Sequence, residues 1–81
     1  MKIIPLRKDV LEYLQERGLA AKWSKAAKLF EADIRHPSLK TELLEPNWCG
    51  IYSFRIDRKY RALFFTRGGS AEVFAVTNHY R

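Results

Sequence analysis

The chain has 81 residues, of which 47% are apolar and 14% aromatic, and its formal net charge is +6. This length excludes a second hydrophobic core and this composition excludes a disordered chain, so we expect one small domain over residues 1–81. The basic charge favours an acidic partner: a nucleic acid, an acidic protein or an anionic membrane surface.

The N-terminal residues predict a short strand and then a helix. Residues 2–6, KIIPL, are apolar enough for a strand, which Pro5 ends or confines to a sheet edge. The next apolar residues recur at helical spacing, with Asp9 as an N-cap or first-turn acid and Gly18 as the stop signal. We therefore expect a first helix between these two residues, with its apolar stripe formed by Val10, Leu11 and Leu14.

A second helix is predicted from Ala20 to about Arg35, where Pro37 prevents it from continuing. Its apolar residues form one stripe: Trp23, Ala26, Ala27, Phe30 and Ile34. Its lysines, among them Lys22, Lys25 and Lys28, form either a solvated face or a contribution to RNA phosphate binding. The two helices are expected to form a hairpin whose apolar stripes are covered by a sheet.

Residues 36–49 contain two prolines and no clear period, so they predict a loop. The loop is long for so small a domain, and long loops are often functional. Three leucines are expected to attach it to the core: Leu39, Leu43 and Leu44. Its charged residues are left for solvent or for a site: Lys40, Glu42 and Glu45.

Residues 50–66, GIYSFRIDRKYRALFFT, predict a β-hairpin around the polar residues 57–59. A loop of those three residues puts Arg55 opposite Arg61 on one face, together with Ser53. Like charges side by side cost stability, and an anionic ligand is one reason to tolerate them. A four-residue loop would move the two arginines apart.

After a turn at residues 67–70, a last strand is predicted over residues 71–76. The resulting order, βααβββ, is an α+β fold in which an N-terminal helical hairpin packs on a small antiparallel sheet. Three aromatic residues of the sheet are expected mainly in the core: Phe54, Phe64 and Phe74.

Cysteine and hydropathy patterns indicate a soluble, cytoplasmic protein. Cys49 is the only cysteine of the sequence, which excludes an internal disulfide and a cysteine cluster for zinc. Residues 1–6 are too short and too soon charged for a signal peptide, and an apolar run of about 18 residues is missing. We expect no membrane association and no cofactor.

Basic and aromatic residues are concentrated from Gly50 onward, a combination that suits RNA, which needs cations for phosphates and rings for unstacked bases. The sequence has two histidines, His36 and His79, without a metal-ligand spacing. His36, beside Pro37, is interpreted as a helix-end residue. His79 follows the last strand, where an acid/base role without metal suits its ordinary pKa near 6.5.

Five residues carry a resemblance to a known family. Glu42 precedes Gly50 by eight residues, Arg61 follows Gly50 by eleven, and the pair His79 and Tyr80 stands near the end of the chain. This pattern resembles the RelE/ParE toxin superfamily of bacterial type II toxin-antitoxin systems, and most of all its YoeB-like (Txe) branch. The loop lacks the paired lysines that RelE-like members use, which favours a YoeB-type site.

The resemblance implies a toxin that inhibits translation as a ribosome-dependent mRNA endoribonuclease, with a cognate antitoxin, the ribosome and mRNA as partners. It implies that Glu42, or Glu45 in its place, is the base, that Arg61 stabilises the phosphorane, that His79 is the acid and that Tyr80 orients the RNA. The product would carry a 2′,3′-cyclic phosphate, without metal. The residues expected to bind RNA are Lys40, Arg55, Arg58, Lys59 and Arg81.

Two other functions fit the same fold. A ParE-like toxin binds DNA gyrase and cuts nothing itself, and a non-toxic module binds only an antitoxin or RNA. A toxin that only binds has no need for the set Glu42, Arg61, His79 and Tyr80, which favours the nuclease. The sequence leaves the oligomeric state of the free protein open.

Overall fold

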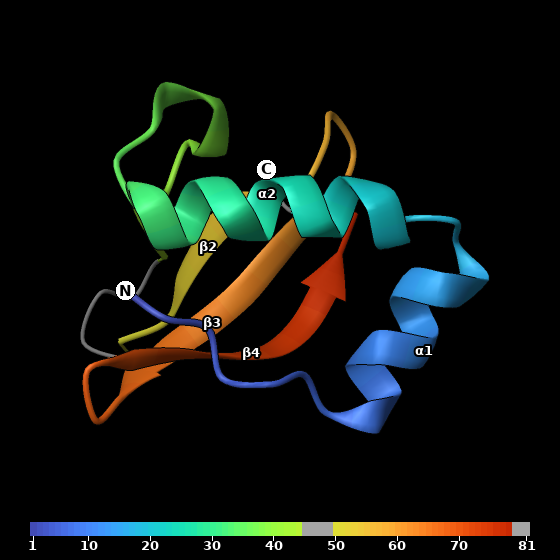
Figure 1. The fold of residues 1–81 in the computed structure, drawn as a ribbon, viewed down its shortest axis with the longest axis horizontal. Helices are drawn as coiled ribbons and strands as arrows, with labels where there is room; N and C mark the ends of the chain where they lie inside the picture. The colour runs from blue at the N-terminus through green and yellow to red at the C-terminus, as the bar shows by residue number, and fades with distance from the viewer. Residues whose placement is uncertain (45–49, 79–81) are drawn as a thin grey trace.

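Figure 1 shows two helices against a twisted sheet in the computed structural model, which describes residues 1–44 and 50–78. The helices are α1 (Lys8–Glu16) and α2 (Ala20–Ala32), followed by a short 3-10 helix, η1 (Pro37–Leu39). The described strands are β1 (Glu42–Leu43), β2 (Tyr52–Arg55), β3 (Arg61–Arg67) and β4 (Ser70–Thr77). They form one antiparallel sheet in the order β1-β2-β3-β4, which confirms the predicted α+β fold.

Helix α1 forms where the apolar spacing predicts it. Val10 and Leu14, one helical turn apart, are buried. Leu11 lies one position further around the helix from Val10 and is 43% exposed, so it is not part of the core. Asp9 lies in the first turn, where a carboxylate suits the helix dipole. The helix ends before Gly18, whose φ of 66° is in the left-handed region that favours glycine.

Helix α2 buries Ala26 and Phe30 and ends at Ala32, three residues before the predicted Arg35. Asp33 has an extended backbone, and its carboxylate accepts a hydrogen bond from the Arg35 amide at 3.0 Å. Such a local bond from side chain to backbone competes with helical hydrogen bonding. Pro37 then begins η1, where a missing amide hydrogen is tolerated.

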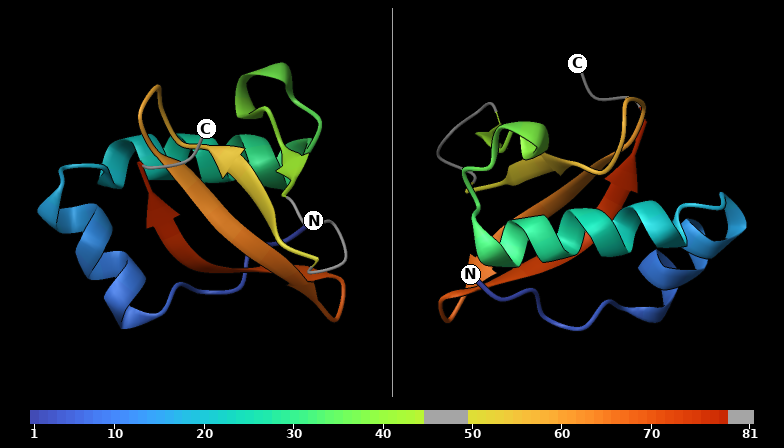
Figure 2. Two further views of the ribbon diagram at one scale, coloured as in Figure 1. Left: turned by 180° about the vertical axis from the view of Figure 1, so that it is seen from behind. Right: turned by 45° about the horizontal axis from the view of Figure 1, so that its top comes forward.

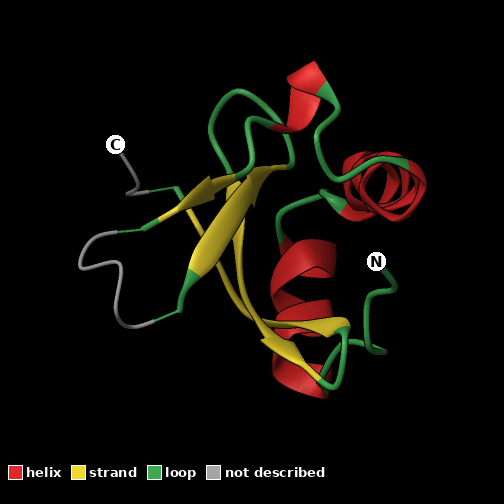
Figure 3. Cartoon of the chain, turned by 90° about the vertical axis from the view of Figure 1, so that its left-hand side faces the viewer, coloured by secondary structure: helices red, strands yellow, loops and turns green. Residues whose placement is uncertain are grey.

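The core lies between the two helices and one face of the sheet, as Figure 3 shows end-on. Phe30 of α2 meets Phe54 of β2 at 4.6 Å and Phe64 of β3 at 5.2 Å between ring centroids. All three rings are fully buried, which confirms the predicted core role of Phe54 and Phe64. No helix in the described part of the chain is long and apolar enough to cross a membrane.

The β2–β3 hairpin has the predicted register, with Arg55 directly opposite Arg61. The Ile56 amide donates to the Tyr60 carbonyl at 2.9 Å, which closes the loop of residues 57–59. Oδ1 of Asp57 accepts hydrogen bonds from the amides of Lys59 and Tyr60, both at 2.8 Å. A carboxylate therefore fixes this turn where no glycine or asparagine is present.

Two segments differ from their predictions. The loop of residues 36–49 contributes β1, which pairs with β2 at the sheet edge, and its Leu43 is 43% exposed rather than in the core. Leu39 is buried as predicted and Leu44 is half-buried. Residues 2–6 make a single parallel bridge, Ile3 to Ala71, because Pro5 has no amide hydrogen to continue a ladder.

Phe74 was expected in the core and is half-buried on the other face of the sheet. The β3–β4 register shifts at a bulge, so that Phe64 faces Val73 and Leu63 faces Ala75. Phe74 has no cross-strand partner and lies 5.8 Å from Phe65, between ring centroids. The left view of Figure 2 shows this face of the sheet from behind, with α2 beyond it.

Candidate active site

Arg61 begins β3, and its side chain is only 10% exposed. Because its neighbour Ala62 belongs to the core, Arg61 points to the sheet face turned away from the helices. Its Nε donates to Ser53 Oγ at 2.9 Å, and its Nη2 donates to the Ser53 carbonyl at 3.3 Å and to the Lys40 carbonyl. These bonds join β3 to β2 and to the segment before β1, and they hold the guanidinium in one place.

Glu42 lies beside this guanidinium. It is in β1, opposite Ser53, and its Oε1 is 3.6 Å from Arg61 Nη2. The Glu42 side chain is 48% exposed, so one end of the ion pair is buried and the other lies partly at the surface. The structure therefore brings together two of the residues that the sequence pattern predicted for catalysis.

Lys40 lies two residues before Glu42 in the chain, and its backbone contacts Arg61. Its φ of 44° is in the left-handed region, which a residue with a side chain adopts at a cost. Its carbonyl accepts the Arg61 hydrogen bond, and its exposed side chain lines a hollow of about 510 Å³. The same hollow contains Glu42 and the half-buried Tyr52, whose ring stacks on Phe64 at 5.4 Å between centroids.

Arg55, opposite Arg61, also lines a groove of about 900 Å³ between α2, η1 and the loop of residues 57–59. Arg58 and Lys59, also predicted to bind RNA, line the same groove. The structure thus gathers three of the predicted RNA-binding residues there. Lys40 lies in the other hollow, on the side of Glu42.

Asp57 holds the groove's loop in place. Burial alone would raise its pKa, but hydrogen bonds from Lys22 Nζ at 3.0 Å and from the Tyr60 and Lys59 amides outweigh burial. The pKa of Asp57 is therefore lower than usual. A lowered carboxylate pKa contributes stability that is present above the ordinary pKa, about 3.9, and is lost as the pH falls through the folded-state value.

We expect Asp57→Ala to lower the free energy of unfolding by about 1–2 kcal/mol at pH 7, through the lost turn and ion-pair bonds. Asp57→Asn keeps an oxygen for the two amides and should cost about half as much. Urea unfolding at pH 7 and pH 3 checks this, because the difference between wild type and Asp57→Ala should shrink at pH 3. An equal difference at both pH values would contradict the role of the ionised carboxylate.

Several predicted residues lie outside the described part of the chain: Glu45, Cys49, His79, Tyr80 and Arg81. The roles predicted for them remain predictions. Thr77, two residues before His79 in the sequence, is the cross-strand partner of Arg61. Within residues 1–44 and 50–78, no group of three His, Cys, Asp or Glu side chains could hold a metal ion.

Three residues of this region had no settled role in the sequence analysis. Ser53 is fully buried and accepts a hydrogen bond from Arg61. Strand alternation placed this serine on the same face as Arg55, which is the sequence feature that could have indicated its role. Lys22 and Lys25 line the groove, although their sequence pattern fits a solvated helix face equally well. The docking of α2 beside the hairpin loop gives these lysines their position.

No family model and no curated protein matches the chain. Solved structures do match its fold. A chain of the heterotetrameric YoeB-YefM toxin-antitoxin complex from Staphylococcus aureus has a TM-score of 0.68 at 21% identity, covering 99% of this chain and 98% of that chain. The YoeB/ParE toxin from Agrobacterium tumefaciens has a TM-score of 0.70 at 20% identity, covering 99% and 100%.

YafQ from E. coli strain BL21(DE3) has a TM-score of 0.71 at 10% identity, covering 96% of this chain and 90% of that chain. All three matches span nearly the whole of both chains, so they concern the complete fold rather than one motif. The chain therefore shares its fold with these YoeB, YoeB/ParE and YafQ toxins, which is the fold that the resemblance in the sequence implies.

Proposed function

We propose that this protein is the toxin of a type II toxin-antitoxin system and acts in the cytoplasm as a ribosome-dependent mRNA endoribonuclease. The observation that carries the proposal is the pair of Glu42 and Arg61, 3.6 Å apart on the sheet face away from the helices. A carboxylate beside a fixed guanidinium offers a proton acceptor and a site for a phosphate at the same place. The fold shared with a YoeB-YefM complex supports a cognate antitoxin as partner.

The proposed reaction needs no group beyond the RNA and this chain. Glu42, or Glu45 in its place, takes the proton of a ribose 2′-hydroxyl, and the 2′-oxygen attacks the adjacent phosphorus. Arg61 stabilises the phosphorane that forms. The bond from phosphorus to the 5′-oxygen breaks, His79 gives that oxygen its proton, and Tyr80 orients the RNA. The products are a 2′,3′-cyclic phosphate and a free 5′-hydroxyl.

The test is inducible expression of wild type, Glu42→Gln, Glu45→Gln and His79→Ala in bacteria, with growth followed and mRNA 5′ ends mapped. Wild type should arrest growth and produce new 5′ ends at in-frame codon positions. Loss of the base or the acid should reduce cleavage about 100-fold or more. Glu12→Gln, which removes an exposed carboxylate of α1, is the matched control and should cleave like wild type.

Other outcomes would replace the proposal. Full cleavage by His79→Ala, or by both glutamate variants, would contradict the assigned acid and base. Growth arrest without new 5′ ends would point to a ParE-like toxin acting on gyrase. No arrest by wild type would leave a module that binds an antitoxin or RNA without cutting.

A further inference from the structure

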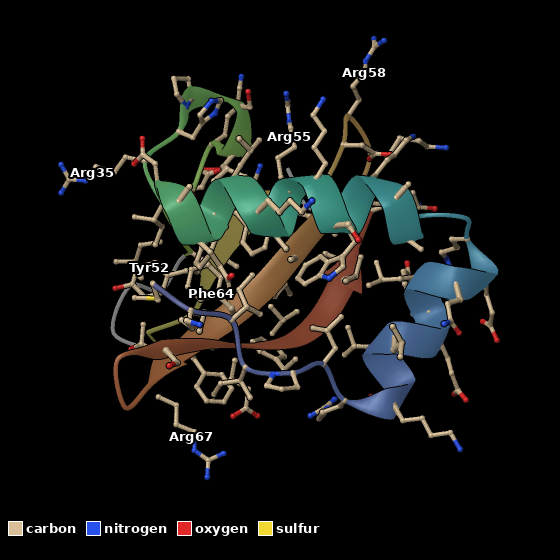
Figure 4. The ribbon with its side chains drawn as sticks, in the orientation of Figure 1. Arg35, Tyr52, Arg55, Arg58, Phe64 and Arg67 are labelled. Atoms are coloured by element: carbon tan, nitrogen blue, oxygen red, sulfur yellow. The ribbon has the colours of Figure 1, made fainter. Side chains whose placement is uncertain are left out.

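The groove of about 900 Å³ beside α2 is strongly cationic. Five of its lining residues are basic: Lys22, Lys25, Arg55, Arg58 and Lys59. They come from helix α2 and from the β2–β3 hairpin, which are far apart in the sequence. Figure 4 shows Arg55 and Arg58 pointing to the same side of the molecule, above α2 in this view, while Arg67 points away at the opposite end. Cations from separate elements therefore converge on one surface.

Asp57 is the one acidic residue among the described residues of the groove, and it pairs with one of the five cations, Lys22, so the groove keeps an excess of positive charge. Its two carboxylate oxygens are already used: Oδ2 by Lys22 Nζ at 3.0 Å, and Oδ1 by the amides of Lys59 and Tyr60. The Asp57 side chain is only 17% exposed, whereas that of Lys22 is 59% exposed. The acid thus sits below the cations and holds the loop that carries two of them.

The floor of the groove is aliphatic, formed by Ala26, Leu29, Leu39 and Ile56. None of its described lining residues is aromatic, so it offers no ring on which a base can stack. Cations without stacking rings contact phosphates and sugars, which give affinity without reading sequence.

The groove and the candidate active site are related through the pairing of β2 with β3. Arg55 lines the groove and is also the direct cross-strand partner of Arg61. If a phosphate of a single strand lies at Arg61, we expect neighbouring phosphates to contact Arg55 and then the lysines of α2. The guanidinium groups of Arg55 and Arg58 have the planar fork that pairs with phosphate oxygens.

We propose that this groove between α2 and the β2–β3 loop binds the phosphate backbone of single-stranded RNA that flanks the cleaved bond, with Lys25, Arg55 and Arg58 as its main contacts. The choice of RNA over an acidic peptide rests on the proposed ribonuclease function and on the cross-strand pairing of Arg55 with Arg61. The groove extends the contact with RNA by several phosphates, and it does so without preference for any base.

The experiment measures binding of a fluorescent single-stranded oligonucleotide of mixed sequence with 2′-O-methyl riboses, which cannot be cleaved. The full chain carries Glu42→Gln, so that cells tolerate it. In this background Lys25→Glu is compared with Lys28→Glu, because both replace an exposed lysine of α2 and only Lys25 lines the groove. Both variants change the net charge equally.

Lys25→Glu should weaken binding roughly fivefold or more at about 100 mM salt, and Lys25→Ala should lower the salt dependence by about 0.7 in log–log slope. Lys28→Glu should stay within about twofold of its parent, since it leaves the groove intact. Two oligonucleotides of different sequence should respond equally. Equal weakening by both glutamate variants, or none by Lys25→Glu, would overturn the groove as a site.

A polyglutamate peptide of equal length distinguishes the other occupant. If Lys25→Glu abolishes binding of the peptide and leaves that of the oligonucleotide unchanged, the groove takes an acidic peptide and the proposal is wrong. This test is separate from that of the nuclease. Groove-dependent binding without cleavage by wild type would contradict the proposed function and leave this inference standing. Cleavage without groove-dependent binding would contradict this inference and leave the proposed function standing.

Discussion

Replacing Arg61 by alanine is expected to abolish growth arrest and to lower the free energy of unfolding by about 2–4 kcal/mol. The truncation removes the donors to Ser53 Oγ, the Ser53 carbonyl and the Lys40 carbonyl. Ser53 is fully buried, so water cannot easily replace what it loses. Lys40, with its left-handed backbone, also loses the contact that holds it, and Glu42 loses its cationic neighbour.

Arg61→Lys keeps the positive charge of the side chain and removes the planar geometry of the guanidinium. An ammonium group reaches one of the acceptors but cannot reproduce the fork that serves Ser53 and Lys40 together. We expect intermediate stability and a loss of cleavage of about 100-fold or more. Urea unfolding measures the stability and 5′-end mapping measures the cleavage. The two measurements together separate a loss of chemistry from a loss of folded protein.

Arg67→Ala is the matched control, at the other end of β3. The Arg67 side chain is 72% exposed and pairs with Glu72 at 3.0 Å on the surface. Such a pair contributes about 0–1 kcal/mol, so this variant should unfold and cleave almost like wild type. If Arg61→Ala proved as stable and as toxic as Arg67→Ala, both the structural and the catalytic role of Arg61 would be wrong.

Phe54→Ala should cost about 3–5 kcal/mol of unfolding free energy, the largest stability effect that we expect of one substitution. The Phe54 ring is fully buried in the core. Its centroid is 4.6 Å from that of Phe30 and 5.8 Å from those of Trp23 and Phe64. A domain of this size has roughly 5–10 kcal/mol in total, so the variant should lose much of its folded population.

Thermal unfolding followed by circular dichroism tests this, with Phe65→Ala as the comparison. Phe65 is half-buried on the opposite face of the same sheet, where it meets Phe74. Because its truncation opens no closed cavity, we expect a clearly smaller fall in melting temperature. Equal falls for the two variants would mean that the core does not lie between the helices and the sheet.

The sequence predicted the elements that local pattern determines. Helix α1 follows from its apolar spacing and from Gly18, and the hairpin register follows from alternation around residues 57–59. Strand β1 could not be predicted in this way, because two residues show no period and their pairing depends on β2, about ten residues away. Phe74 was misplaced because a bulge in the β3–β4 register breaks strict alternation, and nothing in the neighbouring residues marks it.

The candidate site likewise contains residues that could be predicted from the sequence and residues that could not. The family resemblance, which the spacing around Gly50 carries, placed Glu42 and Arg61 in one predicted site, and their side chains lie 3.6 Å apart. The role of Ser53 depends on three segments that meet only in the folded protein, namely β2, β3 and the residues before β1. The lysines of α2 face a groove only because that helix docks beside the hairpin loop, and a helical period cannot specify its neighbour.

The contact between residues 2–7 and β4 has a consequence for self-association. A long edge strand with unpaired amides and carbonyls is a template for aggregation, and β4, with eight residues, is such an edge. Here the Ile4 amide binds the Ala71 carbonyl, the Lys2 carbonyl binds the Ala71 amide, and the Arg7 guanidinium binds the Phe74 carbonyl. At the other edge, in the part of the chain that the structure describes, β1 has two residues. Among the described residues, one edge is thus partly blocked and the strand at the other edge is short, and both features discourage fibre formation.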